Sequence, residues 1–218
     1  MKRTLIVFCI LLILVGFKSE DKAPGIPDHP RIILKKGAEK ELLKGIANNK
    51  TLSSLNDIFL EAAKEMIPLK PVERIQTGRR LLSISRTCLK RVLWLSYSYR
   101  ITGEKKFLLK AEKEMLAAAS FTDWNPSHFL DVAEMTAALA IGYDWLYHDL
   151  SESSRIIIRE AIINKGLNPS KIEKYSQKWL NDVNNWNQVC KWKVTGCRTP
   201  LSMILNLHFY IYYSPCPE

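Results

Sequence analysis

The chain has 218 residues, of which 47% are hydrophobic and 25% charged, and it carries a formal net charge of +10. This composition is typical of a globular protein and excludes an intrinsically disordered chain. The positive charge suits an acidic glycan, nucleic acid or anionic lipid as a partner, although most lysines are scattered along predicted helix faces as solvated surface.

The first residues predict export. Lys2 and Arg3 precede the apolar stretch 4–17, and the polar run 18–21 follows it. A basic start, a short apolar segment and a polar exit are typical of a secretory signal peptide, and the stretch is shorter than the about 20 residues of a transmembrane helix. We therefore expect residues 1–22 to be removed, a periplasmic or secreted mature protein, and no stable membrane anchor after that removal.

The cysteines outside the predicted signal lack the spacing of metal ligands; they are Cys88, Cys190, Cys197 and Cys216. Cys88 falls in a helical run, where a small buried hydrophobic side chain is the usual role. We expect no metal site and no cofactor.

Helical periodicity extends from about residue 35 to residue 182, and no segment before residue 200 alternates as a strand does. Short loops between successive helices predict an all-α protein of antiparallel helices, arranged as a bundle, a solenoid or a closed ring of hairpins. Periodicity does not choose among the three. The expected helices in the first half are Lys36–Asn48, Leu52–Met66, one ending near Thr102 and Gly103, and one with the stripe Phe107, Ala111 and Met115. Those in the second half are Ser127–Tyr147 starting from a cap at Asn125 and Pro126, Arg155–Lys165 opened by Ser151–Ser154 and closed by Gly166, and a short Ser170–Asn181.

The tail differs in composition from the rest of the chain. Lys191–Glu218 holds one acidic residue of the 22 in the protein and contains the aromatic run 208–213. Two interpretations are a native hydrophobic strand and translation in a shifted reading frame after about Cys190, and we favour the second. The expected organisation is then a signal peptide (1–22), a helical fragment (23–190) and an atypical tail (191–218).

Two residues near the start of a predicted helix could carry chemistry. His128 and Asp131 lie three positions apart, on nearly one face of a helix, which could poise the imidazole for proton transfer or only cap a turn.

Trp124 could be a platform for a sugar ring or fill the core. Asp144, next to Tyr143, is expected to anchor a helix end.

A third pattern is the run Asn184–Gln188, which holds four amide side chains around Trp186. Such a run makes a poor core segment and a poor helix. The amides either cap a helix entrance or present hydrogen-bond donors to an anionic oxygen, and the sequence supports both interpretations equally.

Four pieces of the chain carry a resemblance to known proteins: His29-Pro-Arg-Ile32, Tyr99–Phe107, Asp123–Tyr147 and Asn184–Cys190. In their order and spacing, they resemble the heparinase II/III and alginate lyase-like families. The resemblance covers about residues 27 to 190, and after Cys190 the run Lys191–Lys193 departs from it. It implies an incomplete (α/α) toroid of antiparallel helix hairpins, here truncated.

The resemblance also implies a reaction, β-elimination on a polysaccharide that contains uronic acid. An amide neutralises the substrate carboxylate so that the C5 proton can be removed, and Asn187 is our first choice for this role and Asn185 our second. The acid and base of these families come from later parts of the protein, so we expect this fragment to be inactive alone. The expected substrate-binding residues are Trp186, Asn184, Gln188, Trp124 and His128.

The expected partner is an acidic polysaccharide of the heparin or alginate kind, not nucleic acid. Two other interpretations remain open at this point: a non-catalytic, exported glycan-binding helical module, and an exported helical scaffold without affinity for sugars. The aromatic and amide side chains favour the first two interpretations over the third.

Overall fold

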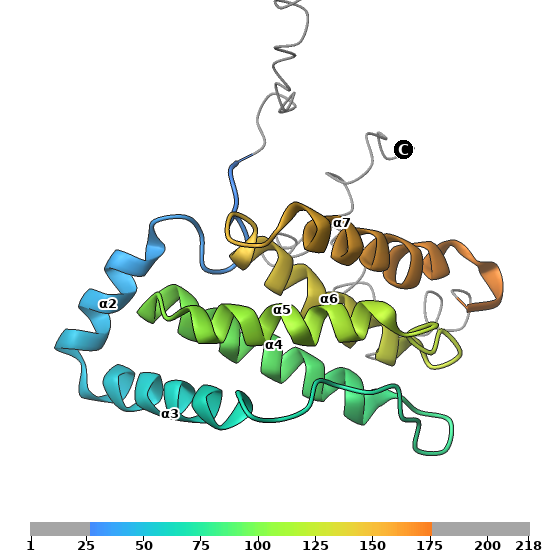
Figure 1. Ribbon diagram of the computed structural model, residues 1–218, viewed down its shortest axis with the longest axis horizontal. Coiled ribbons are helices and arrows are strands. Elements are labelled where there is room, and N and C mark those ends of the chain that lie inside the picture. Colours follow the sequence, from blue (N-terminus) through green and yellow to red (C-terminus); the bar gives the residue numbers. More distant parts are fainter. Residues whose placement is uncertain (1–26, 176–218) are drawn as a thin grey trace, which may run out of the picture.

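The computed structural model describes residues 27–175, and these residues are folded into packed helices (Figure 1). Within this range the only β-type pairing is an isolated bridge between Thr77 and Arg80, so the predicted all-α class is confirmed. No helix between residues 27 and 175 is both long and apolar enough to cross a membrane. The predicted signal peptide, the run Asn184–Gln188 and the tail lie outside the described residues.

The helix bounds agree closely with those expected from periodicity in the first half of the chain. Asn49 begins α3 because its side-chain oxygen accepts hydrogen bonds from the amides of Thr51 and Leu52. Gly103 ends α4 in the left-handed conformation, with φ 72°, as a C-terminal glycine commonly does. The helices are α2 (Ala38–Asn48), α3 (Lys50–Met66), α4 (Leu82–Thr102), α5 (Lys105–Ser120), α6 (Phe129–Leu146) and α7 (Glu152–Ala161), followed by a π-helical turn (Ile162–Leu167) and a 3-10 turn (Asn168–Lys171).

Helix α6 lies at the centre of the core, and every residue in it except Leu130 is buried. It packs most extensively on α4 and also contacts α5, α7 and the π-helical turn. Gly142 permits the close approach to α4 and α5: a Cβ there would lie 2.5 Å from Val92 Cγ1 and 2.4 Å from Met115 Sδ.

The buried carboxylate of Glu114, on α5, holds the connection between α3 and α4. One of its oxygens accepts a hydrogen bond from the Val72 amide at 3.0 Å. The other lies 3.1 Å from Arg91 Nη1 and 2.8 Å from Lys110 Nζ. A buried charge with this many partners is stable in the core, and here it fixes the path of a loop.

Asp144 fixes the path of the N-terminal segment in the same way. Its carboxylate contacts His29 Nδ1 at 2.6 Å and accepts hydrogen bonds from the amides of Arg31 (2.9 Å) and Ile32 (3.0 Å). The neighbouring Trp145 donates its indole N–H to the Ile32 carbonyl. Asp144 therefore anchors a segment more than a hundred residues away and not a helix end, which corrects the expectation from sequence.

The last helix differs most from its expected bounds. The run Ser151–Ser154 opens α7 as expected, because the Ser151 side chain accepts a hydrogen bond from the Ser154 amide, but the helix begins at Glu152, three residues before the expected Arg155. Gly166 lies inside the π-helical turn and does not close a helix. A Cβ at this position would meet Thr136 Oγ1 at 2.6 Å, so the glycine is needed for close packing on α6.

The short helix expected at Ser170–Asn181 is replaced at its start by the 3-10 turn, and most of it lies outside the described residues.

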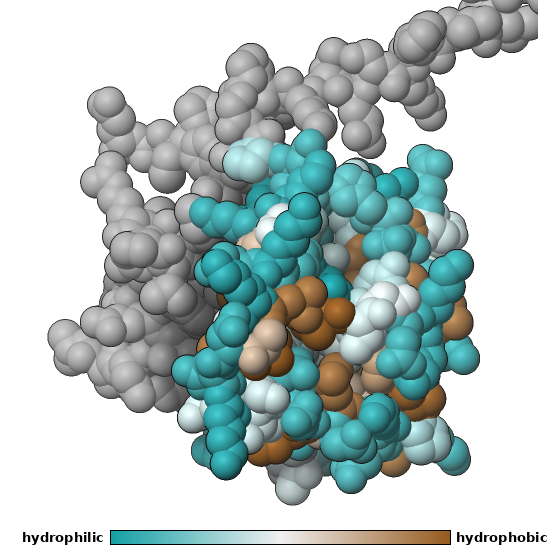
Figure 2. Space-filling view, turned by 90° about the vertical axis from the view of Figure 1, so that its left-hand side faces the viewer, coloured by the Kyte–Doolittle hydropathy of each residue, from teal (hydrophilic) through white to brown (hydrophobic). Residues whose placement is uncertain are grey.

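The face formed by α2 and α3 mixes apolar and polar side chains (Figure 2). The large apolar side chains exposed on these two helices are Leu43, Leu52, Leu55 and Ile58.

Candidate functional site

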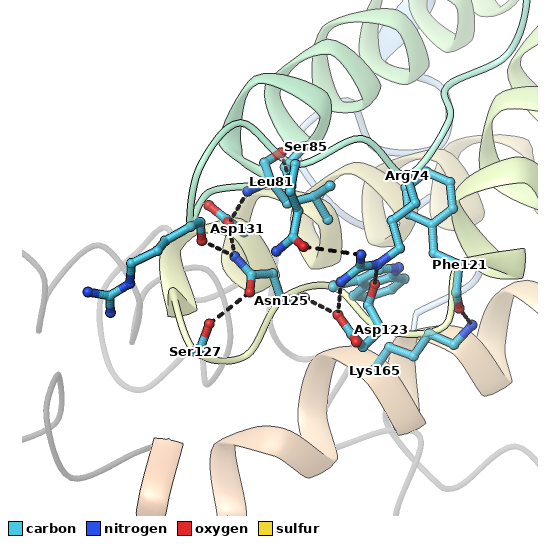
Figure 3. A network of polar contacts seen from close by, with 12 residues as sticks. Arg74, Leu81, Ser85, Phe121, Asp123, Asn125, Ser127, Asp131 and Lys165 are labelled. Carbon is cyan, nitrogen blue, oxygen red and sulfur yellow. Dashed lines mark hydrogen bonds and ion pairs between the residues drawn. The ribbon is translucent and has the colours of Figure 1, made fainter.

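The start of α6 carries a network of buried polar contacts centred on Asp131 (Figure 3). Asp131 is completely buried, and its Oδ2 accepts hydrogen bonds from the Leu81 amide at 2.6 Å and from Asn125 Nδ2 at 2.7 Å. Its Oδ1 lies 2.6 Å from His128 Nδ1. These three contacts fix the carboxylate in position.

Asn125 explains why α6 begins later than expected. It adopts the left-handed conformation with φ 58° and does not cap the helix. Its side-chain amide donates to Asp131 and to the Arg79 carbonyl at 2.8 Å, and its Oδ1 accepts from Ser127 Oγ. The helix starts at Phe129, with His128 in the capping position.

The pairing of His128 with Asp131, which the sequence predicted, is confirmed. In this contact Nδ1 is the ring nitrogen next to the carboxylate, and Nε2 lies on the other side of the imidazole. The side chain of His128 is 15% exposed, whereas that of Asp131 is fully buried. A histidine oriented by a buried aspartate is an arrangement suited to proton transfer or to hydrogen bonding of a ligand.

A turn rich in arginine lies directly beside this network. Thr77 and Arg80 exchange backbone hydrogen bonds of 2.9 and 3.2 Å around Gly78, and the backbone on both sides of Arg80 is held by the Asn125 and Asp131 contacts described above. Arg79 and Arg80 are exposed, and so is Arg86 in the second turn of α4. We call Arg79, Arg80 and Arg86 the arginine patch.

The interpretation of the sequence missed the arginine patch, although a signal was present. Between Arg74 and Gly103 the chain has seven basic residues and no acidic one. Several of these cations meet carboxylates from other helices, since Arg91 contacts Glu114 and Arg100 contacts Glu39. In the patch, Arg86 lies 3.8 Å from Glu134, and the described residues contain no ion pair of the Arg79 or Arg80 side chains. The patch is therefore a positively charged surface.

Arg74 and Asp123 form one side of the network. Arg74 Nη2 lies 2.7 Å from Asp123 Oδ1, which also accepts the Asn125 amide. Burial raises the pKa of Asp123, but the hydrogen bonds from Arg74 and Asn125 and the charge of Arg74 outweigh it, so the pKa lies below its ordinary value. Nearby, Lys165 Nζ contacts the Ala119 and Phe121 carbonyls; burial lowers its pKa, and the charge of Asp123 opposes that shift.

Trp124 is completely buried, and its indole N–H donates to the Ala118 carbonyl at 3.0 Å. No ring face is open to a sugar, so the core interpretation of Trp124 fits the structure and we leave it out of the proposed site. His128 is at the site. The other expected site residues, Asn184, Asn185, Trp186, Asn187 and Gln188, lie outside the described residues.

Within residues 27–175 no group of three or more histidine, cysteine or acidic side chains is arranged to hold a metal ion. Cys88 is buried in the core. The chemistry that the described site offers is therefore recognition of anionic groups by arginine and proton transfer or hydrogen bonding by His128.

No known protein family matches this sequence, and no curated protein matches it either.

Proposed function

We propose that this chain is the helical, substrate-binding part of an exported polysaccharide lyase of the heparinase II/III type, and that it binds an acidic polysaccharide. The observation that carries the proposal is the arginine patch beside the His128–Asp131 pair. Guanidinium groups bind carboxylate and sulfate through paired hydrogen bonds. A polysaccharide with repeated anionic groups could therefore contact several arginines of the patch at once.

The proposed architecture is an incomplete (α/α) toroid of antiparallel helix hairpins. Two features support it. The exposed apolar side chains of α3 lie on one flank of the described helices, and Ile156 and Ile157 are exposed on α7, the last helix. In a ring of hairpins each hairpin covers its neighbour, so both flanks are expected to carry apolar side chains.

The proposed reaction is β-elimination, with Asn187 as the amide that neutralises the uronate carboxylate and Asn185 as the second choice. The charge that this amide meets grows in the transition state. In an assay of β-elimination, Asn187→Ala should lower kcat by about 10²–10³-fold with little change in affinity. The ultraviolet absorbance of the unsaturated product follows the reaction, and a normal kcat in Asn187→Ala would move the role to Asn185.

The binding proposal is tested by removing the charge of the patch. A variant with Arg79→Gln, Arg80→Gln and Arg86→Gln should bind heparin or alginate at least about tenfold more weakly than the parent in calorimetry, because each lost charged contact costs about 1 kcal/mol or more. The matched control removes three exposed lysines from α2 and α3 (Lys40, Lys44 and Lys50), which lowers the net charge by the same amount.

Equal loss of affinity in the two triple variants would mean that overall charge, not the patch, attracts the polysaccharide, and would overturn the proposed site. A DNA oligonucleotide serves as a further ligand. Binding of DNA as tight as that of the glycans at the same salt concentration would favour a general polyanion-binding surface over a glycan site.

A further inference from the structure

The outer face of α4 continues the arginine patch along the helix. Arg86 belongs to the patch, Lys90 follows four residues later, and Trp94 follows after four more. Residues four apart lie on the same face of a helix, one turn above the other. Arg86 and Lys90 are exposed and Trp94 is partly exposed, so the three side chains form a strip along the outside of α4.

Lys90 carries a charge that no carboxylate neutralises within the described part of the chain. The ion pairs that α4 makes there are those of Arg86, Arg91 and Arg100. The Lys90 ammonium group instead lies over the indole ring of Trp94, 4.7 Å from its centroid. A cation–π contact at an exposed site is weak, so the ammonium group can turn from the ring to an anionic group of a ligand.

The ring of Trp94 is held in place by α3 and the core. It packs against the hydrophobic core, and Phe59 of α3 meets it with ring centroids 5.1 Å apart and ring planes at 74°. Phe59 also contacts Tyr97, whose hydroxyl donates a hydrogen bond to Asn56 at 2.9 Å. The orientation of the indole is therefore set before a ligand arrives, which lowers the entropy cost of binding.

The indole N–H of Trp94 is an unused donor. Among residues 27–175 it has no acceptor, and it is not one of the buried side-chain atoms without a partner, which are the hydroxyls of Ser96 and Ser98. The buried Trp124 and Trp145, by contrast, donate their N–H groups to backbone carbonyls. The N–H of Trp94 therefore reaches the surface and can bind a ligand.

We propose that an acidic polysaccharide bound at the arginine patch extends along α4, and that Lys90 and Trp94 form a subsite for one of its sugar residues. This inference rests on the proposed function, which supplies the ligand. The indole packs on the apolar face of the sugar and its N–H donates to an oxygen, while the ammonium group pairs with the carboxylate or sulfate. Arg86 and Trp94 are about 12 Å apart along the helix, a distance that a chain of sugars spans and a single small anion does not.

The test follows the indole N–H signals by NMR in the full chain labelled with ¹⁵N. Trp94→Phe, which keeps an aromatic ring and removes the N–H, assigns the Trp94 signal. Heparin and alginate hexasaccharides are titrated separately at constant ionic strength. We expect a saturable shift of the Trp94 signal with at least one of them and about fivefold weaker binding in Lys90→Gln, since an exposed charged contact is lost.

Lys44→Gln is the matched control, because it removes the same charge from an exposed lysine on α2 and should weaken binding clearly less. The proposal is overturned if a hexasaccharide binds without moving the Trp94 signal, or if the two lysine variants lose equal affinity. In either case the arginine patch keeps its ligand and only the path along α4 is lost. If neither hexasaccharide binds the parent chain in calorimetry, the proposed function itself fails, and the subsite with it.

Discussion

At the scale of single residues, the features that organise the molecule are three buried carboxylates. Glu114, Asp131 and Asp144 are each fully buried, and each accepts at least one backbone amide from a connecting segment. Backbone amides outside helices need an acceptor when they are buried. The carboxylates therefore give the irregular segments a defined position over the helices.

Removing one of these carboxylates should be costly. Asp131→Ala leaves the Leu81 amide, Asn125 and His128 without their shared acceptor, and we expect the free energy of unfolding to fall by roughly 3–5 kcal/mol. Urea denaturation measures this loss. His128→Gln is the control: it removes one partly exposed donor and should cost clearly less. Equal losses in the two variants would contradict the central role of Asp131.

The Arg74–Asp123 pair should make the stability of the folded protein depend on pH in the acid range. Because the pKa of Asp123 is lowered in the folded state, the pair stabilises the protein above the unfolded value of about 4, and this contribution is lost as the pH falls through the folded value. The difference in the free energy of unfolding between the parent and Asp123→Asn should therefore shrink as the pH is lowered from 6 to 3. Thermal unfolding at a series of pH values checks this, and a constant gap would contradict it.

Cys88 should be chemically inert in the folded protein. Burial raises the pKa of its thiol far above the ordinary range, and the side chain is inaccessible. Peptide mapping after iodoacetamide treatment should find Cys88 unmodified under native conditions and alkylated in denaturant. Rapid alkylation under native conditions would show that the core around α4 opens readily.

At the scale of elements, α6 is the helix on which the others depend, and Gly142 is its closest point of contact. Gly142→Ala should lower the free energy of unfolding by about 1–3 kcal/mol, because Val92 and Met115 occupy the space of the added methyl group. Gly45→Ala on α2 is a matched control, since its methyl group would meet only Leu52 Cδ1 at an ordinary 3.4 Å. That control should be neutral or stabilising, as alanine favours helix over glycine.

The helices were predictable from the sequence because their periodicity and end signals are local. Asn49, Gly103 and Ser151 mark helix ends through contacts with residues within four positions. The roles of Asp144 and Gly166 were not predictable in this way. Each is decided by a neighbour in space that is far away in the chain, and a single sequence does not record which residues those are.

The candidate site was predictable only in part for the same reason. The contact between His128 and Asp131 is local, and its spacing indicated it. The position of the arginine patch depends on a turn whose backbone is hydrogen-bonded to Asn125 and Asp131, about fifty residues further along the chain. The lack of acidic residues around that turn could have pointed to it, but not to its place beside His128.

At the scale of the whole molecule, both ends of α6 bear arginine side chains, with the arginine patch at one end and Arg155, 4.7 Å from the centroid of the Tyr147 ring, at the other. The helix between them is buried except at Leu130.

The bond between Asp144 and the N-terminal segment has a consequence for the order of events during synthesis. His29 leaves the ribosome 115 residues before its partner does. Until α6 has been made, the amides of Arg31 and Ile32 have no carboxylate to bind, so helices α2 to α5 can begin to pack while this segment is still unattached. Closing so long a loop costs chain entropy, which slows the contact. The N-terminal segment is therefore expected to dock on α6 among the last steps in the folding of the described residues.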